Sequence, residues 1–401
     1  MNQFPVEDDC LVVGGRPLPQ LARCVGSTPF YVYDRRLITQ RVEEVRRAIP
    51  SQIKLHYAIK ANPMPALLCH MSSLVDGLDV ASGAELVNAL SSGAKARDIS
   101  FAGPGKSANE LEQVVAAGIL VNVESLRELR CLADISARGG LPARVAIRVN
   151  PEFELKSSGM RMSGGAKQFG MDASEVPAAL REVSRLGLAF EGFHIYSGSQ
   201  NLRPGAICEA QALAVKLAVQ LAQHASRETK VVNIGGGFGV PYFPGDQRLD
   251  LQPIGEGLEV LVQQLAMALP GACLIIELGR FLVAEAGLYV CRVVDRKISR
   301  GQVFLITDGG LHHHLAASGN FGQVLRKNYP VVIGNRVLGG RREVASVVGP
   351  LCTPLDLLAD RMELAEAHPG DLVAIYQSGA YGLTASPTAF LSHPAPVEIL
   401  V

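Results

Sequence analysis

Strand-like and helical segments alternate from residue 53 to residue 277, and this alternation restricts the possible folds more than any other feature of the sequence. Eight runs rich in β-forming residues are predicted to be strands, at residues 53–59, 78–80, 99–102, 119–123, 144–149, 190–195, 231–234 and 273–277. Amphipathic segments between them are predicted to be helices, at residues 84–90, 109–117, 126–137, 175–186, 208–223 and 257–268. Eight strand–helix units favour a closed parallel (β/α)8 barrel of the TIM type, with a doubly wound open sheet as the alternative.

The pattern changes after Glu277, where strand-like runs follow one another without long helices. These runs are predicted at residues 288–295, 303–307, 344–348, 372–376 and 397–401. They favour a separate antiparallel β domain, and the early run at residues 10–13 is expected to join it. We therefore predict a barrel domain over residues 29–277 and a β-sandwich or β-barrel domain formed by residues 1–28 and 278–401.

Composition and charge exclude several classes of protein. Lysine plus arginine equals aspartate plus glutamate at 38 each, so the chain has no overall basic field of the kind that nucleic-acid binding favours. No run of 18 apolar residues occurs, and the nearest one, at residues 206–222, is interrupted by polar side chains, so no membrane span is expected. The acidic N-terminal segment shows no secretory leader, and a cytoplasmic protein is expected. The eight cysteines form no C-x-x-C pair and are interpreted as reduced thiols.

Polar side chains occur where the predicted barrel strands end. Lys60 follows the first strand, and five further positions share this placement: Asp79, Arg148, His194, Glu277 and the glycine run that begins at Gly235. Barrel enzymes place their reactive groups at the carboxyl ends of the strands. Each of these residues alone could be a buried structural partner, but together they indicate one shared site.

Lys60 and the glycine run predict the type of cofactor. A partly desolvated lysine favours its neutral amine, which can condense with an aldehyde to form a Schiff base. Gly235, Gly236 and Gly237 carry no side chains, so their backbone N–H groups can surround a phosphate. The run lacks the spacing of an ATP-binding P-loop or of a dinucleotide fold. A phosphorylated aldehyde fits both features, and pyridoxal 5'-phosphate is that cofactor.

At this point the motifs resemble the pyridoxal-phosphate decarboxylases of the alanine-racemase-like barrel fold, especially diaminopimelate and ornithine decarboxylases. The motifs are YAIKAN at 57–62, DVASGAE at 79–85, GGGFG at 235–239, ELGR at 277–280, GPLC at 349–352 and GAY at 379–381. The resemblance extends over nearly the whole chain. It implies removal of the α-carboxylate from an L- or D-configured amino acid through an aldimine on Lys60 and a quinonoid intermediate.

The resemblance also implies roles for individual residues. His194 would stack on the pyridine ring, and Glu277 would face the ring nitrogen and keep it protonated, which favours decarboxylation over racemisation. Arg148 would contact the phenolic oxygen of the cofactor. The residues expected to hold the phosphate are Gly237, Gly279, Arg280, Tyr381 and Ser197. Two departures from the family motifs are Tyr196 in place of a glycine and Leu278 in place of a proline.

Cys352 would protonate the substrate carbon after carbon dioxide leaves. In this family the segments of Cys352 and Tyr381 come from the second subunit, so a homodimer with shared active sites is implied. The family places an acidic residue after the cysteine to bind the distal amine of the substrate, but here that residue is Thr353. Thr353, Arg326 and Tyr329 are the predicted substrate-binding residues.

The segment at residues 311–335 also looks similar to decarboxylases that act on glutamyl groups tethered to acyl-carrier proteins. Residues 320–342 hold five basic side chains and no acidic one, so they could dock an acidic carrier or form a solvated surface. We therefore expect an amino-acid substrate whose distal end is neutral or thioester-linked, with a free diamino acid such as diaminopimelate as the alternative.

Three further interpretations are considered. A racemase of the same fold is disfavoured by Glu277 and Cys352, and a catalytically silent relative is disfavoured by the intact Lys60 and glycine run. The His312-His313-His314 triplet is not expected to bind a metal, because consecutive side chains point in different directions and no acidic or cysteine partner lies at ligand spacing.

Overall fold

The computed structural model describes the whole chain except residues 1–2, 154–159, 162–163, 244, 322 and 324–325. The chain divides into two compact units. Unit 1 consists of Met1–Gln40, Pro241–Asp246 and Leu282–Val401, and unit 2 consists of Arg41–Val240 and Gln247–Phe281.

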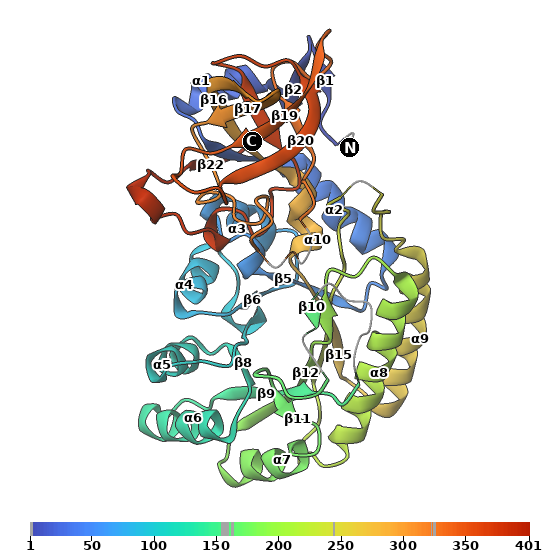
Figure 1. Cartoon of the computed structure of the whole chain (residues 1–401). Coiled ribbons are helices and arrows are strands. Elements are labelled where there is room, and N and C mark those ends of the chain that lie inside the picture. The colour runs from blue at the N-terminus through green and yellow to red at the C-terminus, as the bar shows by residue number, and fades with distance from the viewer. Residues whose placement is uncertain (1–2, 154–159, 162–163, 244, 322, 324–325) are drawn as a thin grey trace. The chain divides into compact units, whose positions relative to one another are not determined.

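Unit 2 is a closed barrel of eight parallel strands, so the predicted fold class is confirmed and the open-sheet alternative is wrong. The strands pair in the order β9-β12-β14-β15-β5-β6-β7-β8, and β8 pairs with β9 to close the ring (Figure 1). Their bounds are β5 Lys54–Ala58, β6 Gly77–Val80, β7 Ile99–Phe101, β8 Leu120–Val123, β9 Arg144–Asn150, β12 Ala189–Ile195, β14 Val231–Gly236 and β15 Cys273–Leu278. All eight correspond to predicted strands. The short β10 Met160–Arg161, β11 Met171–Asp172 and β13 Gly198–Ser199 lie in the connections.

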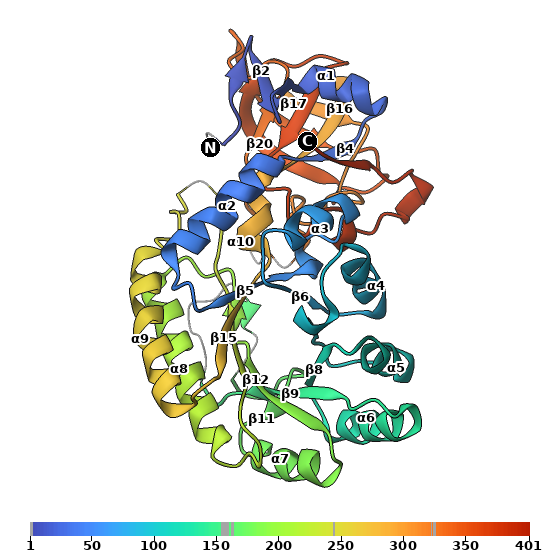
Figure 2. The ribbon, with the colours of Figure 1, turned by 180° about the vertical axis from the view of Figure 1, so that it is seen from behind.

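The barrel helices form an outer layer around the strands, as Figures 1 and 2 show. Their bounds are α3 Pro65–Ser72, α4 Gly83–Ser91, α5 Ala108–Ala117, α6 Leu126–Gly139, α7 Val176–Arg185, α8 Pro204–Ala222 and α9 Gln252–Ala268. Helices α4, α5 and α6 begin at a serine whose hydroxyl accepts the N–H of a glutamate three residues later. This N-cap satisfies a backbone donor at each helix start and fixes where the chain leaves the strand.

Within the described residues, α8 is the one helix long and apolar enough to cross a membrane by length and composition alone. In unit 2 it packs against α9, β12 and β14, and its buried positions include Ala214, Ala218 and Leu221. Of the polar residues that interrupt the run in the sequence, Glu209, Lys216 and Gln220 are exposed on its other face, whereas Gln211 is buried.

Unit 1 contains an eight-stranded sheet that is mixed, whereas an antiparallel sheet was expected. Its strands are β4 Phe30–Tyr33, β16 Gly287–Ser299, β17 Gln302–Thr307, β18 Val331–Ile333, β19 Arg342–Val348, β20 Leu357–Ala365, β21 Leu372–Ile375 and β22 Val397–Leu400. Two pairs, β17 with β19 and β22 with β4, are parallel. Long connections precede β19 and β22, so these strands need not run antiparallel to their neighbours as hairpin strands must.

The N-terminal segment joins unit 1 in two ways. Strands β1 Val6–Glu7, β2 Cys10–Val13 and β3 Arg16–Pro17 form a small sheet of their own, followed by α1 Leu18–Val25. Leu11 and Val13 of β2 pack into a buried cluster with β16 and β21, as expected for this run. The strand that enters the large sheet is β4, which pairs with β16. For this reason residues 29–40 fall in unit 1 rather than in the barrel, and the predicted domain boundaries stay a prediction.

Candidate active site

Four side chains named from the sequence come from the carboxyl ends of the barrel strands. Lys60 lies in the 3-10 turn η1 Ile59–Ala61, directly after β5. Asp79 lies in β6, Arg148 in β9 and His194 in β12, and the last two are paired neighbours in the sheet. All three are less than a tenth exposed. The structure thus brings together in unit 2 the barrel residues that the sequence grouped.

Glu277 in β15 lies close to His194. The Nε2 atom of His194 is 3.3 Å from Oε2 of Glu277, but neither ring nitrogen of this buried histidine makes a hydrogen bond within the described structure. Burial alone would raise the pKa of the Glu277 carboxyl. His194, Lys60 and Arg148 outweigh burial and lower that pKa to about 2, so the carboxylate is ionised at neutral pH.

Asp79 is held by its neighbours on the adjoining strands. Its Oδ1 accepts the Ser100 hydroxyl at 2.5 Å and lies 3.1 Å from Nδ1 of His56. Its Oδ2 is buried without a hydrogen-bond partner among the described residues. Burial lowers the pKa of His56, but the nearby carboxylates, Asp79 first among them, together raise it by more, so the net shift is upward. Because an orphaned buried carboxylate oxygen is costly, Oδ2 indicates a ligand at this site.

Lys60 is exposed, so the partial desolvation expected from the sequence is not found, and its side chain lies beside an aromatic ring and a carboxylate. Its Nζ is 5.6 Å from the ring centroid of Tyr196, and its charge acts on Glu85. Glu85 belongs to the first turn of α4, and its side chain accepts the N–H of Ala81 at 2.6 Å. Burial raises the pKa of Glu85, with Ala81 and Lys60 opposing that shift.

The glycine run is closely packed, so its glycines are sterically required. A Cβ on Gly237 would lie 2.6 Å from the carbonyl oxygen of Gly198, and one on Gly236 would overlap the carbonyl oxygen of Glu277. Gly235 and Gly237 also have positive φ. Two segments therefore meet closely, the run at the end of β14 and the segment after β12 that carries Ser197.

Two further groups belong to the same region. Ser199, in β13, has a buried hydroxyl with no partner among the residues described. Gly279 and Arg280 follow β15, and a Cβ on Gly279 would lie 3.0 Å from Cβ of Ala61, beside Lys60 in the sequence. Gly279 thus lies against the η1 turn, on the same side of the barrel as the glycine run.

Cys352 and Thr353 lie in unit 1, in the loop between β19 and β20. Cys352 is exposed, and the N–H of Thr353 donates to Leu351 O at 2.8 Å. Asp356 shapes this loop, because its Oδ2 accepts the N–H of Leu351 at 2.8 Å and its Oδ1 that of Leu311 at 2.6 Å. The loop is therefore fixed by a carboxylate already bound to backbone donors.

The remaining predicted residues also lie in unit 1. Tyr381 has positive φ and stacks on Phe321, with the ring centroids 6.3 Å apart. Arg326 donates from Nη2 to Leu357 O at 2.7 Å. Tyr329 is buried, and its ring lies 5.0 Å from that of Tyr242. Arg326 and Tyr329 thus have structural roles within unit 1, and their substrate contacts stay a prediction.

Comparison with known proteins decides the family. The pyridoxal-binding-domain model of the pyridoxal-dependent decarboxylases matches residues 35–284, which span the barrel and all its site residues. The chain belongs to the pyridoxal-dependent decarboxylases. The decarboxylase therefore uses pyridoxal 5'-phosphate and acts on an amino acid, as the sequence predicted.

Its relatives cover nearly the whole chain. The decarboxylase is 40% identical over 379 residues to the L-glutamyl-(BtrI acyl-carrier protein) decarboxylase of Niallia circulans, covering 93% of this chain and 88% of that protein. It is 34% identical over 397 residues to the diaminopimelate decarboxylase of Aquifex aeolicus, covering 98% of this chain and 91% of that protein. The crystal structure of diaminopimelate decarboxylase from Helicobacter pylori complexed with L-lysine matches with a TM-score of 0.84 at 29% identity, covering 96% of this chain and 94% of that one.

The barrel residues of the decarboxylase fit this cofactor. Lys60 supplies an amine, and the glycines of the run let the segments that carry Tyr196, Gly198 and Glu277 approach one another closely. The ring nitrogens of His194, Oδ2 of Asp79 and the hydroxyl of Ser199 are buried polar atoms without hydrogen-bond partners among the described residues, although Nε2 of His194 lies 3.3 Å from Glu277. A polar ligand would satisfy such atoms, which are otherwise rare in folded proteins.

The basic segment of the decarboxylase is less open than its sequence indicates. Arg341 lies 3.4 Å from a carboxylate oxygen of Glu366, and Arg342 lies 3.6 Å from Glu363. The acidic partners lie outside the basic segment: Glu363 belongs to β20, and Glu366 directly follows that strand. Arg336 similarly lies 3.6 Å from Asp371. The structure therefore favours a paired surface here over a free cationic patch.

The histidine triplet is buried in unit 1, and no group of side chains suited to a metal occurs among the described residues. The backbone N–H of Ala317 donates to Nδ1 of His314, so its Nε2 carries the proton and donates to the Ser378 hydroxyl at 2.9 Å. His313 Nε2 donates to Pro394 O at 3.0 Å. The triplet thus fixes backbone segments of unit 1.

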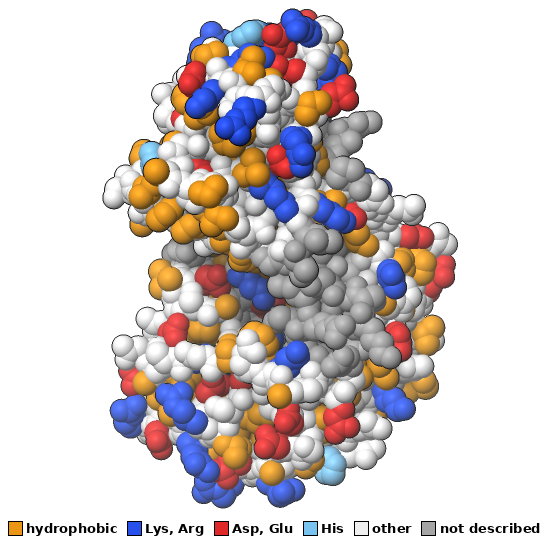
Figure 3. Space-filling view, viewed as in Figure 1, with side chains coloured by type: hydrophobic (Ala, Val, Ile, Leu, Met, Phe, Trp, Pro, Cys, Tyr) orange, Lys and Arg blue, Asp and Glu red, His pale blue; other side chains and the backbone are white. Residues whose placement is uncertain are grey.

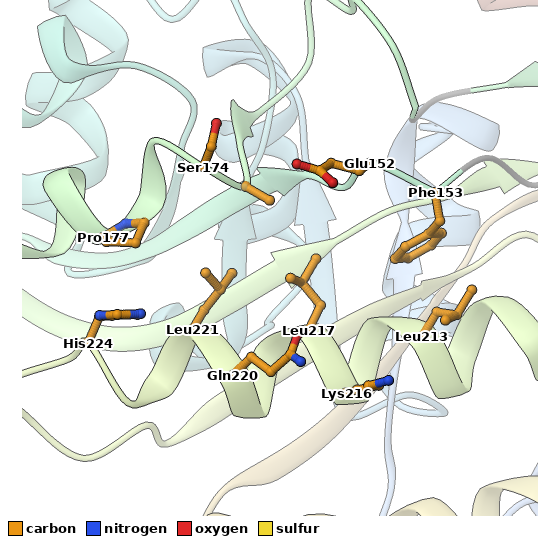
Figure 4. A pocket seen from close by; sticks show the side chains of 11 residues that line it. Glu152, Phe153, Ser174, Pro177, Leu213, Lys216, Leu217, Gln220, Leu221 and His224 are labelled. Carbon is orange, nitrogen blue, oxygen red and sulfur yellow. The ribbon is translucent and has the colours of Figure 1, made fainter.

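A separate pocket of about 520 Å³ lies on the outside of the barrel. Figure 4 shows Leu213, Leu217 and Leu221 of α8 on one side, with Pro177 of α7 and Phe153 facing them. None of the predicted site residues lines it. It is a groove between barrel helices and has no part in the candidate active site.

Sequence reasoning missed the residues that surround Arg148. Nη1 of Arg148 donates to Oε1 of Glu124 at 2.8 Å, and Lys106 and Glu128 lie behind that carboxylate. The signal for Glu124 was present, because it directly follows β8 as Lys60 follows β5. Lys106 has no such signal, since its contact with Glu128 spans 22 residues.

Proposed function

We propose that the decarboxylase removes the α-carboxylate from an amino acid whose distal end carries no free ammonium, with a glutamyl group held on an acyl-carrier protein as the candidate substrate. The observation that carries this proposal is Thr353, which follows Cys352 where a diamino-acid decarboxylase is expected to place a carboxylate. A buried ammonium without a charge partner costs several kcal/mol, so free diamino acids are expected to bind poorly.

No carboxylate in the loop stands in for the missing one. From Pro350 to Asp360 the acidic residues are Asp356 and Asp360. Asp356 is buried and accepts backbone N–H groups at both oxygens. Asp360 accepts the Ser346 hydroxyl at 3.1 Å and lies beside Arg361. Neither is available to pair with a substrate ammonium, and the relative from Niallia circulans, named for a glutamyl-carrier substrate, agrees with this reading.

Each residue of the candidate site would have its own role in the reaction. Bound pyridoxal phosphate supplies a ring that accepts the electron pair left when carbon dioxide departs. The Lys60 amine would anchor the cofactor, the ionised Glu277 would keep the ring nitrogen protonated, and His194 would pack on the ring face. The Cys352 thiol would deliver a proton to the substrate carbon. The geometry of the barrel supports the proposed roles of Glu277 and His194, whereas the role of Cys352, which lies in unit 1, rests on the family motif.

We also propose that the protein is a homodimer in the cytoplasm and that Cys352 and Tyr381 serve the barrel of the partner subunit. Unit 1 exposes the large apolar residues Leu355, Phe390 and Leu391. Figure 3 shows hydrophobic side chains gathered where the C-terminal 3-10 turn of unit 1 lies. A contiguous exposed apolar patch marks an interaction surface, so this gathering supports the proposed dimer. All eight cysteines are free, as a reducing compartment would keep them.

Carbon dioxide release from a panel of substrates tests the proposed function. The panel contains glutamyl groups on an acyl-carrier protein, free glutamate, meso-diaminopimelate, ornithine and lysine. We expect release from the carrier-linked substrate and a kcat/KM at least about tenfold lower for each free diamino acid, since an unpaired buried charge costs several kcal/mol and about 1.4 kcal/mol already corresponds to tenfold. Efficient turnover of free diaminopimelate would instead assign the chain to the diaminopimelate decarboxylases, the second candidate.

The carrier itself can be tested at the basic segment. Arg341→Gln with Arg342→Gln is compared with Glu363→Gln and Glu366→Gln, which remove the other half of each ion pair. If the arginines bind an acidic carrier, the first variant raises KM for the carrier-linked substrate and the second does not. Equal effects would mean that these arginines serve only the fold of unit 1.

A further inference from the structure

Arg148 belongs to a buried network of four charged side chains. Glu124 follows β8, Lys106 precedes α5, and Glu128 lies in the first turn of α6. The exposed fractions of the four residues are 7% for Arg148, 7% for Glu124, 3% for Lys106 and 1% for Glu128. Charges of this kind are almost never buried unless they are paired, so the network requires an explanation.

Glu124 is the centre of the network. Its Oε1 accepts Nη1 of Arg148 at 2.8 Å and the N–H of Gly103 at 2.6 Å, and its Oε2 accepts the N–H of Gly170 at 2.9 Å. Gly103 lies in the loop after β7, and Gly170 lies just before β11. One carboxylate therefore joins three segments of the barrel mouth and leaves little freedom for its own side chain.

Lys106 and Glu128 support this carboxylate from behind. Nζ of Lys106 donates to Gly103 O at 2.7 Å and to the two carboxylate oxygens of Glu128 at 3.2 and 3.0 Å. All three ammonium donors are thus used. Oε2 of Glu128 also accepts the backbone N–H of Glu124 at 2.8 Å. Burial raises the pKa of Glu124, but Arg148 and Lys106 outweigh it and lower the pKa, so Glu124 is ionised.

Arg148 itself is only partly engaged. Among the described residues Nη1 donates its one hydrogen bond, to Glu124, and the guanidinium carbon lies 5.0 Å from the ring centroid of Phe169. Its neighbour in the sheet is His194, and its charge lowers the pKa of Glu277. The guanidinium is therefore held at one end, with further donors left for a ligand.

We propose that Glu124 is a positioning residue that orients Arg148 toward the bound cofactor, with Lys106 and Glu128 fixing the place and charge of Glu124. This inference rests on the proposed function, because it assigns a purpose to Arg148 within the cofactor site. Buried ion pairs add little net stability compared with apolar packing. Their usefulness here is orientation, since an arginine held at one Nη presents its remaining donors in a fixed plane.

The test measures cofactor binding in a double-mutant cycle. The variants are Glu124→Gln, Arg148→Gln and the two combined, with Glu124→Asp as the conservative replacement. The dissociation constant for pyridoxal phosphate is measured by absorbance titration, and thermal unfolding without cofactor reports stability separately. If Glu124 acts through Arg148, Glu124→Gln weakens cofactor binding about tenfold alone and changes it little once Arg148 is replaced. Glu124→Asp should restore part of the affinity.

The matched control is Glu191→Gln. Glu191 lies 3.4 Å from Arg144, an ion pair at the amino end of β9, the strand that carries Arg148 at its other end. This control should leave the dissociation constant unchanged whatever it does to thermal unfolding. If Glu124 had a purely structural role, Glu124→Gln would leave the dissociation constant for the cofactor unchanged, as Glu191→Gln does.

The outcomes separate this inference from the proposed function. If the wild-type chain does not bind pyridoxal phosphate, the proposed function fails. If it binds and Glu124→Gln is folded with unchanged affinity, or the effects of Glu124→Gln and Arg148→Gln simply add, Glu124 does not position Arg148. Should Glu124→Gln not fold, Lys106→Met decides in its place: weaker cofactor binding supports the network, and unchanged binding overturns it.

Discussion

Tyr196 shows how a single residue constrains its neighbours. A Cβ on Gly235 would lie 2.6 Å from Cδ2 of Tyr196, so the tyrosine ring requires glycine at that place near the end of β14. The same ring lies 6.3 Å from that of His194 and 5.6 Å from Nζ of Lys60. An aromatic ring at this distance stabilises a protonated lysine modestly. The departure from the family motif therefore lies inside the candidate site.

The reactive amine is tested by replacing Lys60. Lys60→Ala is expected to abolish carbon dioxide release, because Lys60 supplies the amine that anchors the cofactor. It is also expected to abolish the covalent attachment of the cofactor that borohydride reduction otherwise produces. Lys54→Ala is the matched control, since Lys54 is the exposed first residue of the same strand. Peptide mass mapping after borohydride reduction locates the link. Label on another lysine, or activity retained by Lys60→Ala, would refute the assignment.

The missing charge after Cys352 is tested by restoring it. Thr353→Glu is expected to raise kcat/KM for free meso-diaminopimelate about tenfold, because a hydrogen bond to a charged group contributes 1.5 to 3 kcal/mol. Thr353→Gln has the same length without the charge and serves as the control. Initial rates of carbon dioxide release measure both variants. If the two variants behave alike, Thr353 does not occupy the place of the distal-amine partner.

At the scale of elements, the histidine triplet is a turn that ties segments of unit 1 together. His314 is bonded to Ser378, three residues before Tyr381, and the residue before the triplet donates its N–H to Asp356 of the Cys352 loop. The Tyr31 hydroxyl donates to His313 O at 2.6 Å. One turn thus connects the segments that carry Cys352 and Tyr381, which would serve the active site together.

This turn makes stability depend on pH. Burial lowers the pKa of His312 to about 3, of His313 to about 4 and of His314 to about 3. Unfolded histidines titrate near pH 6.5, so between about pH 6.5 and pH 4 the unfolded state binds more protons than the folded state. The free energy of unfolding is therefore expected to fall as the pH drops through that window, by up to about 1.4 kcal/mol per pH unit for each histidine. Asp356 and His56 act in the opposite sense, because the pKa of each is raised in the folded state.

Urea unfolding from pH 7 to pH 4.5 measures that dependence. His312 is the residue to replace, because neither of its ring nitrogens has a partner among the described residues. His312→Leu should keep the free energy of unfolding at pH 7, since a buried polar group without a partner costs more than an apolar one of similar size. The slope of that free energy against pH should fall by the equivalent of about one proton, because one titrating histidine is lost. His368→Gln, at an exposed histidine, is the control. An unchanged slope in His312→Leu would mean that the triplet does not resist protonation.

The sequence predicted the barrel strands because each is short, rich in β-formers and bounded by turn residues. It missed α2 Arg35–Ala48, whose many charged residues hide its apolar face, and β20, which mixes charges with apolar residues. It also missed β4, whose pairing partners β16 and β22 lie more than 250 residues away. Such pairings are set by tertiary packing, so no local sequence pattern predicts them. The same reason hides Lys106 and its contact with Glu128.

At the scale of the whole molecule, the candidate site residues divide between the two units. Lys60, Glu277 and the other predicted cofactor groups except Tyr381 belong to unit 2, whereas Cys352, Thr353 and Tyr381 belong to unit 1. The change of pattern after Glu277 predicts two domains, but Gly279 and Arg280 follow that boundary in the sequence and still belong to unit 2. An active site could take its unit 1 residues and its unit 2 residues from the same chain or from two chains of a dimer. The order of the motifs along one chain does not distinguish these two arrangements.

Mixing inactive variants tests whether the sites are shared. Lys60→Ala and Cys352→Ala are each expected to be inactive, but a mixed dimer would contain one site with both defects and one with none. After subunit exchange, about a quarter of the wild-type activity should return, because half of the randomly mixed dimers are mixed and each has one of two sites intact.

The control pair is Lys60→Ala with Glu277→Ala, two defects that both lie in unit 2. Every site of a mixed dimer then keeps one defect, whether sites are shared or not, so no activity should return. Co-purification through a tag on one variant establishes that exchange has occurred. Proven exchange without recovery in the Lys60 and Cys352 pair would place each complete site within a single chain. Recovery in both pairs would show instead that the variants repair one another by some route other than a shared site, because only the first pair can rebuild an intact one.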